Sequence, residues 1–330
     1  MTKTAKLNLT FLILAIFSIG GSYAYVLLTN GMELPIYADL LVAQLLILLP
    51  AWGYTKKEHI NLYKEIRHRR LHFGALLCLV GITLLSMPLL SFLNLFSSLF
   101  VPNAAAGLAE QMTGGPGWMN ILFLAVIPAF SEEFVFRGVF FHGYRSHGFW
   151  KAALMSGLVF GMFHLNINQF AYALVSGVIF AYMAEATGSI WSSVIAHFVV
   201  NSYSITINQI LKLSGLYSAV NDTATGTQDE LTSITMSSRL AGIFMMFVIG
   251  AVFMLLAVLC IRNMAKRNGR LEVIRESFRI GHKKGSYNNS SSEGASGNGE
   301  LLSADNMSGD GEVLSDTAAR SNHVLTAPAV

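Results

Sequence analysis

The sequence predicts an all-α polytopic membrane protein, a bundle of about eight transmembrane helices that encloses a polar cavity and carries a disordered C-terminal tail. Three observations predict this fold class. The chain is 53% hydrophobic and only 12% charged, about half the charged fraction of soluble domains. Its apolar residues lie in runs of about 20, the length that crosses a hydrocarbon core of about 30 Å. Its basic residues collect in alternate connections between these runs.

The predicted spans, in order, are 8–28, 35–54, 73–101, 119–144, 151–170, 171–187, 189–211 and 239–262. Lys3 and Lys6 precede the first span as in a signal peptide. Its apolar run is longer than that of a usual signal peptide, so we expect a retained helix. A short turn around 166–169 separates the fifth span from the sixth. Cys78 and Cys260 lie in apolar runs, and we expect core or lipid-facing residues there, with no disulfide or metal pair.

The basic residues also predict the orientation of the spans. They crowd the connections after the second and fourth spans and the segment after the eighth, whereas the opposite connections hold only Lys212 and Arg239. The positive-inside rule then places both termini in the cytoplasm, with the chain in the plasma membrane if its source is bacterial. The basic connection 56–72 either anchors this topology or forms an amphipathic helix on anionic lipid.

Two regions are expected along the chain. Residues 1–262 form the transmembrane helical domain, and the active site lies within 119–211. Residues 263–330 form a cytoplasmic segment that is basic at first and disordered from about 285. The Ser-, Gly- and Asn-rich composition of that tail buries too little apolar area to offset chain entropy.

The fourth span carries two adjacent carboxylates, Glu132 and Glu133, and a basic residue, Arg137. A charged side chain at the centre of a membrane helix costs about 3 kcal/mol, so such groups usually face the protein interior and serve a function. Glu133 and Arg137 are four residues apart and can form an ion pair. Glu132 points elsewhere and has no evident partner on its own helix. Pro128 permits a kink that would turn Glu132 inward. A buried ion-pair network that only stabilises helix packing is the structural alternative.

Two further spans carry polar groups on defined faces. In the fifth span, Gly157 and Gly161 share a face with His164, and glycines let a neighbouring helix approach closely. The seventh span has a polar stripe with intervals of three or four residues, formed by Ser193, His197, Asn201, Ser204 and Asn208. Such a stripe faces protein or water instead of lipid. Each feature alone is also compatible with a hydrogen-bonded helix contact.

Carboxylates and imidazoles on three separate helices can together activate a water molecule. One route uses a divalent metal such as zinc, held by Glu132, His164 and His197, which lowers the pKa of bound water. In the other, metal-free route, Glu132 and a histidine take the proton directly. Arg137 or Asn201 could then stabilise the oxyanion formed when water adds to a carbonyl. The residues leave both routes open.

The pattern Glu132-Glu133-x-x-x-Arg137, Phe160-x-x-x-His164 and His197-x-x-x-Asn201 resembles that of the CPBP family of intramembrane proteases. This family, also called the Abi family, includes the type II CAAX prenyl endopeptidases. The resemblance covers 132–201 and implies an eight-helix bundle that hydrolyses a peptide bond near the membrane. It implies that Glu132 and His164 activate water and that His197 and Asn201 bind or polarise the scissile carbonyl. Glu133 and Arg137 would form a supporting ion pair.

Other enzyme classes lack their sequence signatures. The chain has no His-Glu-x-x-His motif, no Gly-x-Ser-x-Gly motif and no Walker-type phosphate loop. Two non-peptidase hypotheses remain, a proton-coupled transporter that uses the Glu and His cluster and a non-catalytic membrane scaffold or immunity protein. The expected partners of a peptidase are the lipid bilayer and a peptide or lipidated protein substrate, with no nucleic acid. The substrate would be a prenylated protein, a bacteriocin precursor or a signal peptide.

Overall fold

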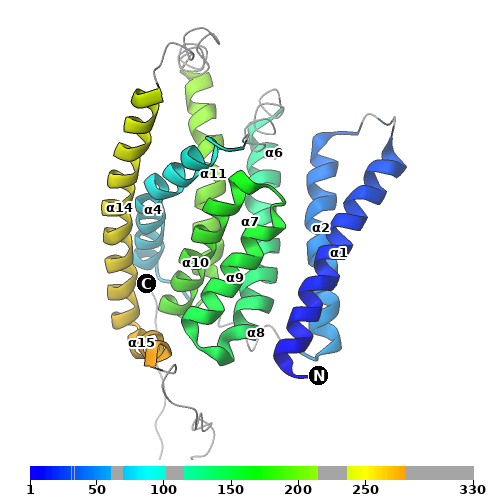
Figure 1. Ribbon diagram of the computed structural model, residues 1–330, viewed down its shortest axis with the longest axis horizontal. Coiled ribbons are helices and arrows are strands. Elements are labelled where there is room, and N and C mark those ends of the chain that lie inside the picture. Colours follow the sequence, from blue (N-terminus) through cyan, green and yellow to red (C-terminus); the bar gives the residue numbers. More distant parts are fainter. Residues whose placement is uncertain (31, 33, 61–69, 102–114, 215–235, 280–330) are drawn as a thin grey trace, which may run out of the picture. The chain divides into compact units, whose positions relative to one another are not determined.

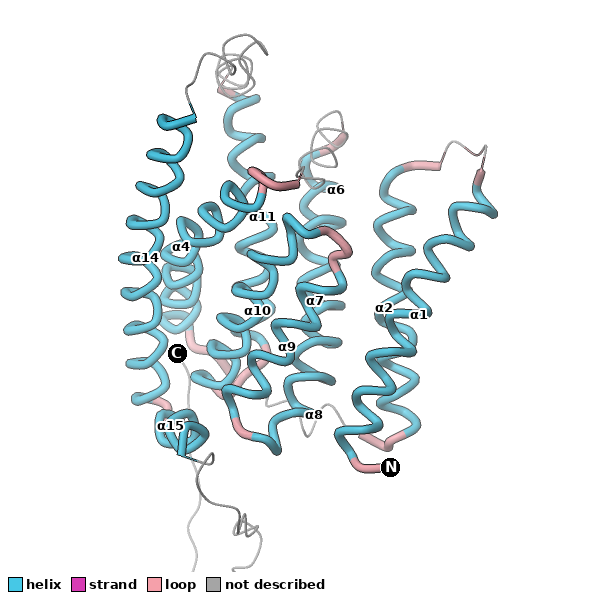
Figure 2. Tube along the Cα trace, in the orientation of Figure 1, coloured by secondary structure: helices cyan, strands magenta, loops and turns pink. Residues whose placement is uncertain are grey.

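The fold is known from a computed structural model that describes residues 1–30, 32, 34–60, 70–101, 115–214 and 236–279. In these residues the chain forms helices and no strand (Figures 1 and 2). The long helices are α1 (Lys3–Thr29), α2 (Ile36–Lys57), α4 (Phe73–Ser97), α9 (Phe149–Phe163), α10 (Ile167–Thr187), α11 (Trp191–Leu213) and α14 (Met236–Arg267), and a short α15 (Leu271–Arg279) follows them. The predicted all-α polytopic bundle is therefore confirmed.

The fourth predicted span is a composite helix whose hydrogen-bonding pattern changes along its length. It consists of α6 (Gly117–Ile121), η2 (Leu122–Val126), α7 (Ile127–Glu133), η3 (Phe134–Phe141), α8 (His142–Tyr144) and the 3₁₀ turn η4 (Arg145–His147). The segments η2 and η3 are π-helical. Such wider turns are rare and occur frequently at functional sites. Here they flank the short α7, which carries both carboxylates.

Six stretches are long and apolar enough to cross a membrane by themselves, as far as the described residues show. They are Lys3–Thr29, Ile36–Lys57, Phe73–Ser97, Gly117–His147, Ile167–Thr187 and Leu240–Arg267. The other two predicted spans are also helices, α9 and α11. With 15 residues, α9 extends only about 22 Å, and the polar stripe of α11 makes that helix less apolar. The chain is a multi-pass integral membrane protein.

The predicted boundary between the fifth and sixth spans, placed at 170, is wrong. Helix α9 ends at Phe163, and α10 begins at Ile167. Leu165 adopts a left-handed conformation with φ of 50°, and the Asn166 side chain accepts a hydrogen bond from the Gln169 amide at 3.1 Å. An Asn at this position caps the start of a new helix. Hydropathy placed the end of the fifth helix too late, because the apolar run continues across this capping residue.

Close helix contacts hold α9 against α10, as the glycines of the fifth span predicted. A Cβ atom at Gly157 would lie 2.8 Å from the Leu174 carbonyl oxygen, and one at Gly161 would lie 3.0 Å from the Phe170 carbonyl oxygen. On α10, a Cβ atom at Gly177 would lie 2.8 Å from the Gly157 Cα atom. Only glycine permits this approach, which brings the Gly177 backbone next to Arg137 of the fourth span.

One end of the bundle holds the start of α1, the end of α2, α8 and α15 (Figure 1). Thr4 of α1 bonds His147 at 2.7 Å, and Lys6 pairs with Glu58 at 2.6 Å. Glu185 of α10 pairs with both Arg145 and Arg270. The start of α1 and the end of α14 thus lie on the same side, as an even number of crossings requires. The cytoplasmic assignment of that side remains a prediction from the positive-inside rule.

Other predictions concern residues beyond those described. The amphipathic helix considered for 56–72 falls mostly on 61–69, and the disordered tail falls on 285–330; both lie outside the described residues. The two-region division at 262 stays a prediction, although α14 itself continues to Arg267. Cys78 and Cys260 are free and exposed, which fits the lipid-facing alternative.

Candidate active site

Helices from four parts of the chain meet at the candidate site. The predicted residues come from the fourth span, from the end of α9 and from α11, and they are Glu132, Glu133, Arg137, His164, His197 and Asn201. A further residue, Gln44, comes from α2. Helix α7 packs against both α2 and α11, and this packing decides which side chains meet.

The predicted ion pair between Glu133 and Arg137 is formed and is almost wholly buried. Arg137 Nη1 donates to Glu133 Oε1 at 2.8 Å, and the two side chains are 1% and 0% exposed. Arg137 Nη2 donates to the Gly177 carbonyl at 3.0 Å. The guanidinium also lies over the rings of Phe160 and Phe180, 4.7 and 5.2 Å from their centroids. Arg137 is therefore held in the protein interior by Glu133, the Gly177 carbonyl and two aromatic rings.

Glu133 also orients His197. The Nδ1 atom of His197 lies 2.9 Å from Glu133 Oε1, and a carboxylate that accepts this bond places a proton on Nδ1. The imidazole stacks on Phe180 with ring centroids 5.3 Å apart, and it meets Phe160 edge to face at 5.6 Å. His197 is only 3% exposed. The ring is therefore held on two sides by aromatic contacts and on a third by the carboxylate.

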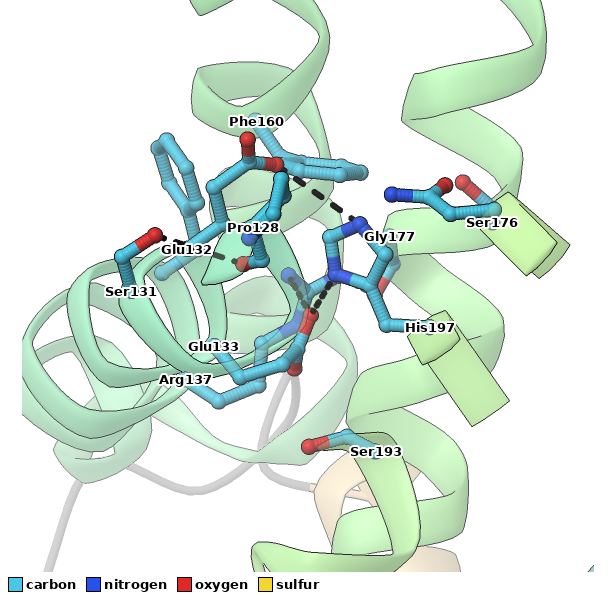
Figure 3. Close-up of polar contacts among 12 residues, drawn as sticks. Pro128, Ser131, Glu132, Glu133, Arg137, Phe160, Ser176, Gly177, Ser193 and His197 are labelled. Carbon is cyan, nitrogen blue, oxygen red and sulfur yellow. Dashed lines mark hydrogen bonds and ion pairs between the residues drawn. The ribbon is translucent and has the colours of Figure 1, made fainter. Parts of the chain in front are cut away.

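The second carboxylate faces the other nitrogen of the same ring. Glu132 Oε2 lies 3.7 Å from His197 Nε2, and Figure 3 shows both carboxylates directed toward His197 from one helix. This separation is too long for a direct hydrogen bond, and a water molecule can bond to both groups across such a gap. The Glu132 side chain is 14% exposed, whereas that of Glu133 is fully buried. Glu132 is thus the carboxylate that a reactant can reach.

Gln44 fixes the position of Glu132, and the sequence prediction missed it. Gln44 Nε2 donates to Glu132 Oε1 at 3.0 Å, and the Ser131 hydroxyl donates to Gln44 Oε1. The amide is therefore held at both its donor and its acceptor ends. A polar side chain within the apolar run 35–54 was the available signal, because polar groups in membrane helices usually face another helix.

Asn201 supplies a hydrogen bond that the backbone of the fourth span lacks at Pro128. Pro128 has no N–H group to donate to the Leu124 carbonyl, four residues earlier. Asn201 Nδ2 donates to that carbonyl at 3.1 Å. The predicted kink residue and the predicted polar residue of α11 are thus coupled through one hydrogen bond. The side chains of Ser204 and Asn208, further along the stripe, lie outside the described part.

His164 lies at the end of α9 and is connected to the other groups through Phe160. Its Nδ1 atom is 2.9 Å from the Phe160 carbonyl oxygen, and its ring meets the Phe160 ring edge to face at 4.9 Å. Phe160 therefore touches both histidines and Arg137. The structure brings Glu132 to His197, and it records no direct bond between Glu132 and His164.

The described residues do not assemble the three-ligand metal set that the sequence left open. No three His, Cys, Asp or Glu side chains within them lie close enough together to hold one ion. His197 uses Nδ1 for Glu133, which leaves Nε2 and Glu132 Oε2 as two donors without a third at ligand distance. Among the described residues a zinc ion would therefore lack the three protein ligands that a catalytic zinc site uses.

Comparison with known proteins finds similarity in the part of the chain that holds these residues. The family model described as "Type II CAAX prenyl endopeptidase Rce1-like" matches residues 114–203. The chain is also similar to a curated protein of Bacillus subtilis (strain 168), "Putative membrane peptidase YdiL", with 27% identity over 88 residues. That alignment covers 26% of this chain and 36% of the relative, so the chain spans about a third of the relative's length.

No solved structure gave a significant match. The segment matched by the family model contains all six predicted site residues and excludes α1, α2 and α4. Over residues 114–203, this chain is similar to the type II CAAX prenyl endopeptidases of the CPBP, or CAAX protease, family.

Proposed function

We propose that this protein is an intramembrane endopeptidase that hydrolyses a peptide bond of a membrane-associated or lipidated peptide, with Glu132 as the general base. One observation carries the proposal. A reachable carboxylate, Glu132, faces the Nε2 atom of an imidazole at 3.7 Å inside an apolar helical bundle, and a second carboxylate orients that imidazole. The same arrangement of an oriented imidazole beside a reactive group operates in hydrolytic enzymes of other folds.

In the proposed reaction Glu132 takes a proton from water as the water oxygen adds to the scissile carbonyl carbon. His197, with protons on both ring nitrogens, donates from Nε2 to the oxyanion that forms. When the carbon–nitrogen bond breaks, the proton on Glu132 passes to the leaving amine, so that acid and amine products balance. Gln44 holds Glu132 in the orientation that faces His197.

His164 and Asn201 have supporting roles in this proposal. The Nδ1 atom of His164 is occupied by the Phe160 carbonyl, so its Nε2 atom is available to share the attacking water. Helix α9 is shorter than the hydrocarbon core, and its polar turn at 164–166 therefore ends within membrane depth, where backbone groups need water or protein partners. Asn201 supports the site by keeping the Pro128 region of the fourth span in place.

The substrate class follows from the surroundings of the site. A bundle of apolar helices admits a peptide that already lies in or on the membrane, such as a prenylated protein, a bacteriocin precursor or a signal peptide. With both termini in the cytoplasm, as the positive-inside rule predicts, the basic end of the bundle faces the cytoplasmic leaflet.

The decisive test is Glu132→Gln in purified protein reconstituted with lipidated and unmodified membrane peptides. We expect the rate of cleavage to fall by about 10²- to 10⁴-fold, the contribution of general base catalysis. Mass spectrometry of the fragments measures this rate. Glu58→Gln, which alters an acid at the end of the bundle, serves as the control and should cleave normally. Unchanged cleavage by Glu132→Gln would refute the assignment.

The same preparation separates the two alternative functions. A proton-coupled transporter would show substrate flux that depends on the pH gradient and would release no fragment. A scaffold protein would neither cleave nor transport, and Glu132→Gln would leave its partner binding intact. The geometry favours the peptidase, because a transport relay does not require that Glu133 and two aromatic rings hold His197 in one orientation.

A further inference from the structure

A second site lies between α4 and α14, which take no part in the candidate active site. These helices pack against each other along their length, and a cavity of about 600 Å³ opens between them at the basic end of the bundle. Helix α4 begins at this end and α14 ends there (Figure 1). The two antiparallel helices thus contribute their polar ends to the same rim.

The rim of the cavity is cationic, and the described residues give its arginines no ion-pair partner. Arg70, just before α4, and Arg267 from the end of α14 line it, and its lining contains no Asp or Glu among the residues that the structure describes. No carboxylate of the described residues pairs with either guanidinium. Nearby arginines behave differently, since Arg145 and Arg270 share the carboxylate of Glu185. Within the described part of the chain, two exposed arginines therefore lie beside one cavity without a countercharge.

The lining changes from charged to apolar along the cavity. It runs from Arg70, just before α4, along that helix past Cys78 to Ile82 and Leu85. The twelve helical rises from Phe73 to Leu85 correspond to about 18 Å, a depth that reaches well into the hydrocarbon of one leaflet. A free anion would use only the rim. A molecule with an anionic head and an apolar chain matches the whole lining.

We propose that this cavity binds an anionic phospholipid, with its phosphate against Arg70 and Arg267 and one acyl chain along α4 toward Leu85. Basic pockets between membrane helices at the cytoplasmic side recognise lipid headgroups in this way. The first amide groups of α4 have no side-chain cap, and the positive end of the helix dipole adds to the attraction. The inference does not depend on the peptidase reaction.

Titration of delipidated full-length protein, followed by native mass spectrometry, tests the proposal. The probe is phosphatidylglycerol, and phosphatidylcholine with the same acyl chains is the zwitterionic comparison. We expect R70Q/R267Q to bind phosphatidylglycerol roughly 25-fold more weakly, about fivefold for each cation at a membrane surface. The control is R262Q/K266Q, which removes the same charge from exposed positions of α14 that do not line the cavity.

The two cysteines of the chain locate the bound lipid. Both Cys78 and Cys260 line this cavity, both are exposed, and the chain has no others. Phosphatidylglycerol should slow their reaction with N-ethylmaleimide in the wild type and in R262Q/K266Q, but not in R70Q/R267Q. Phosphatidylcholine and free inorganic phosphate should not slow it.

Three results would overturn the proposal. Equal protection by phosphatidylcholine would show an apolar contact without headgroup recognition, and protection by free phosphate would show an anion site without a lipid. An equal loss of binding in R262Q/K266Q would show a general effect of surface charge. Thermal unfolding of each variant establishes that it is folded, which exposed arginine substitutions are expected to permit.

Discussion

The buried pair of Glu133 and Arg137 allows a quantitative prediction. Glu133→Gln leaves the Arg137 guanidinium buried without a countercharge, and Arg137→Met leaves the Glu133 carboxylate in the same state. Loss of one partner of a buried ion pair costs about 3–5 kcal/mol. Folded proteins are stable by only about 5–15 kcal/mol, so either single variant should lose a large part of its stability.

The double variant Glu133→Gln, Arg137→Met should lose much less than the two single losses combined. Removal of both charges also removes the desolvation cost that each imposes. In the wild type the Nε atom of Arg137 is buried without a hydrogen-bond partner within the described residues, so the pair is incompletely satisfied. We therefore expect the double variant to be at least as stable as the less stable of the two single variants.

The assay is unfolding of purified protein in mixed micelles with increasing denaturing detergent, followed by circular dichroism. The control is Lys6→Gln with Glu58→Gln, a partly exposed pair that should change stability by about 1 kcal/mol or less. Additive losses in the double variant, or single losses as small as those of the exposed pair, would refute the reasoning. Either result would mean that the charges do not depend on each other.

Three further predictions concern separate parts of the structure. Gln44→Leu removes the donor to Glu132; we expect peptide cleavage to fall about 10- to 100-fold while the unfolding midpoint changes little, and unchanged cleavage would exclude Gln44 as a positioning residue. Glu185→Gln weakens the bonds to Arg145 and Arg270 and should cost about 1–3 kcal/mol of stability, measured by the same unfolding assay. A loss of stability smaller than that of Glu58→Gln would contradict a stabilising role for these two ion pairs. Removal of divalent metals with a chelator should leave cleavage unchanged, and elemental analysis should find no stoichiometric metal; activity lost on chelation and restored by zinc would overturn the metal-free route.

Several features of the fold and the site were predictable from the sequence because they depend on local order. Apolar runs of membrane-crossing length produce helices, since lipid offers the backbone no hydrogen-bond partners. Spacing of four residues placed Glu133 and Arg137 within reach, and the glycines of the fifth span predicted close packing. The end of α9 was also predictable, since Asn166 is a helix-capping residue. The apolar run that continues past Asn166 led instead to a predicted span that ended at residue 170.

The partners across helices could not be predicted from the sequence. Periodicity assigns residues to a face of one helix, yet it does not state how that helix is rotated against its neighbours. Packing of α7 between α2 and α11 decided that Glu132 meets Gln44 and His197, and no direct bond joins it to His164. The same packing places Asn201 where it donates a hydrogen bond to the Leu124 carbonyl.

The sequence by itself determined the membrane class, the order of the helices and the residue types available for chemistry, because composition and short-range spacing decide these. Only the tertiary structure decided which carboxylate is reachable and which is buried. Glu132 and Glu133 are adjacent in the chain, but neighbouring helical residues point about 100° apart. The surrounding helices therefore bury one with Arg137 and leave the other facing His197.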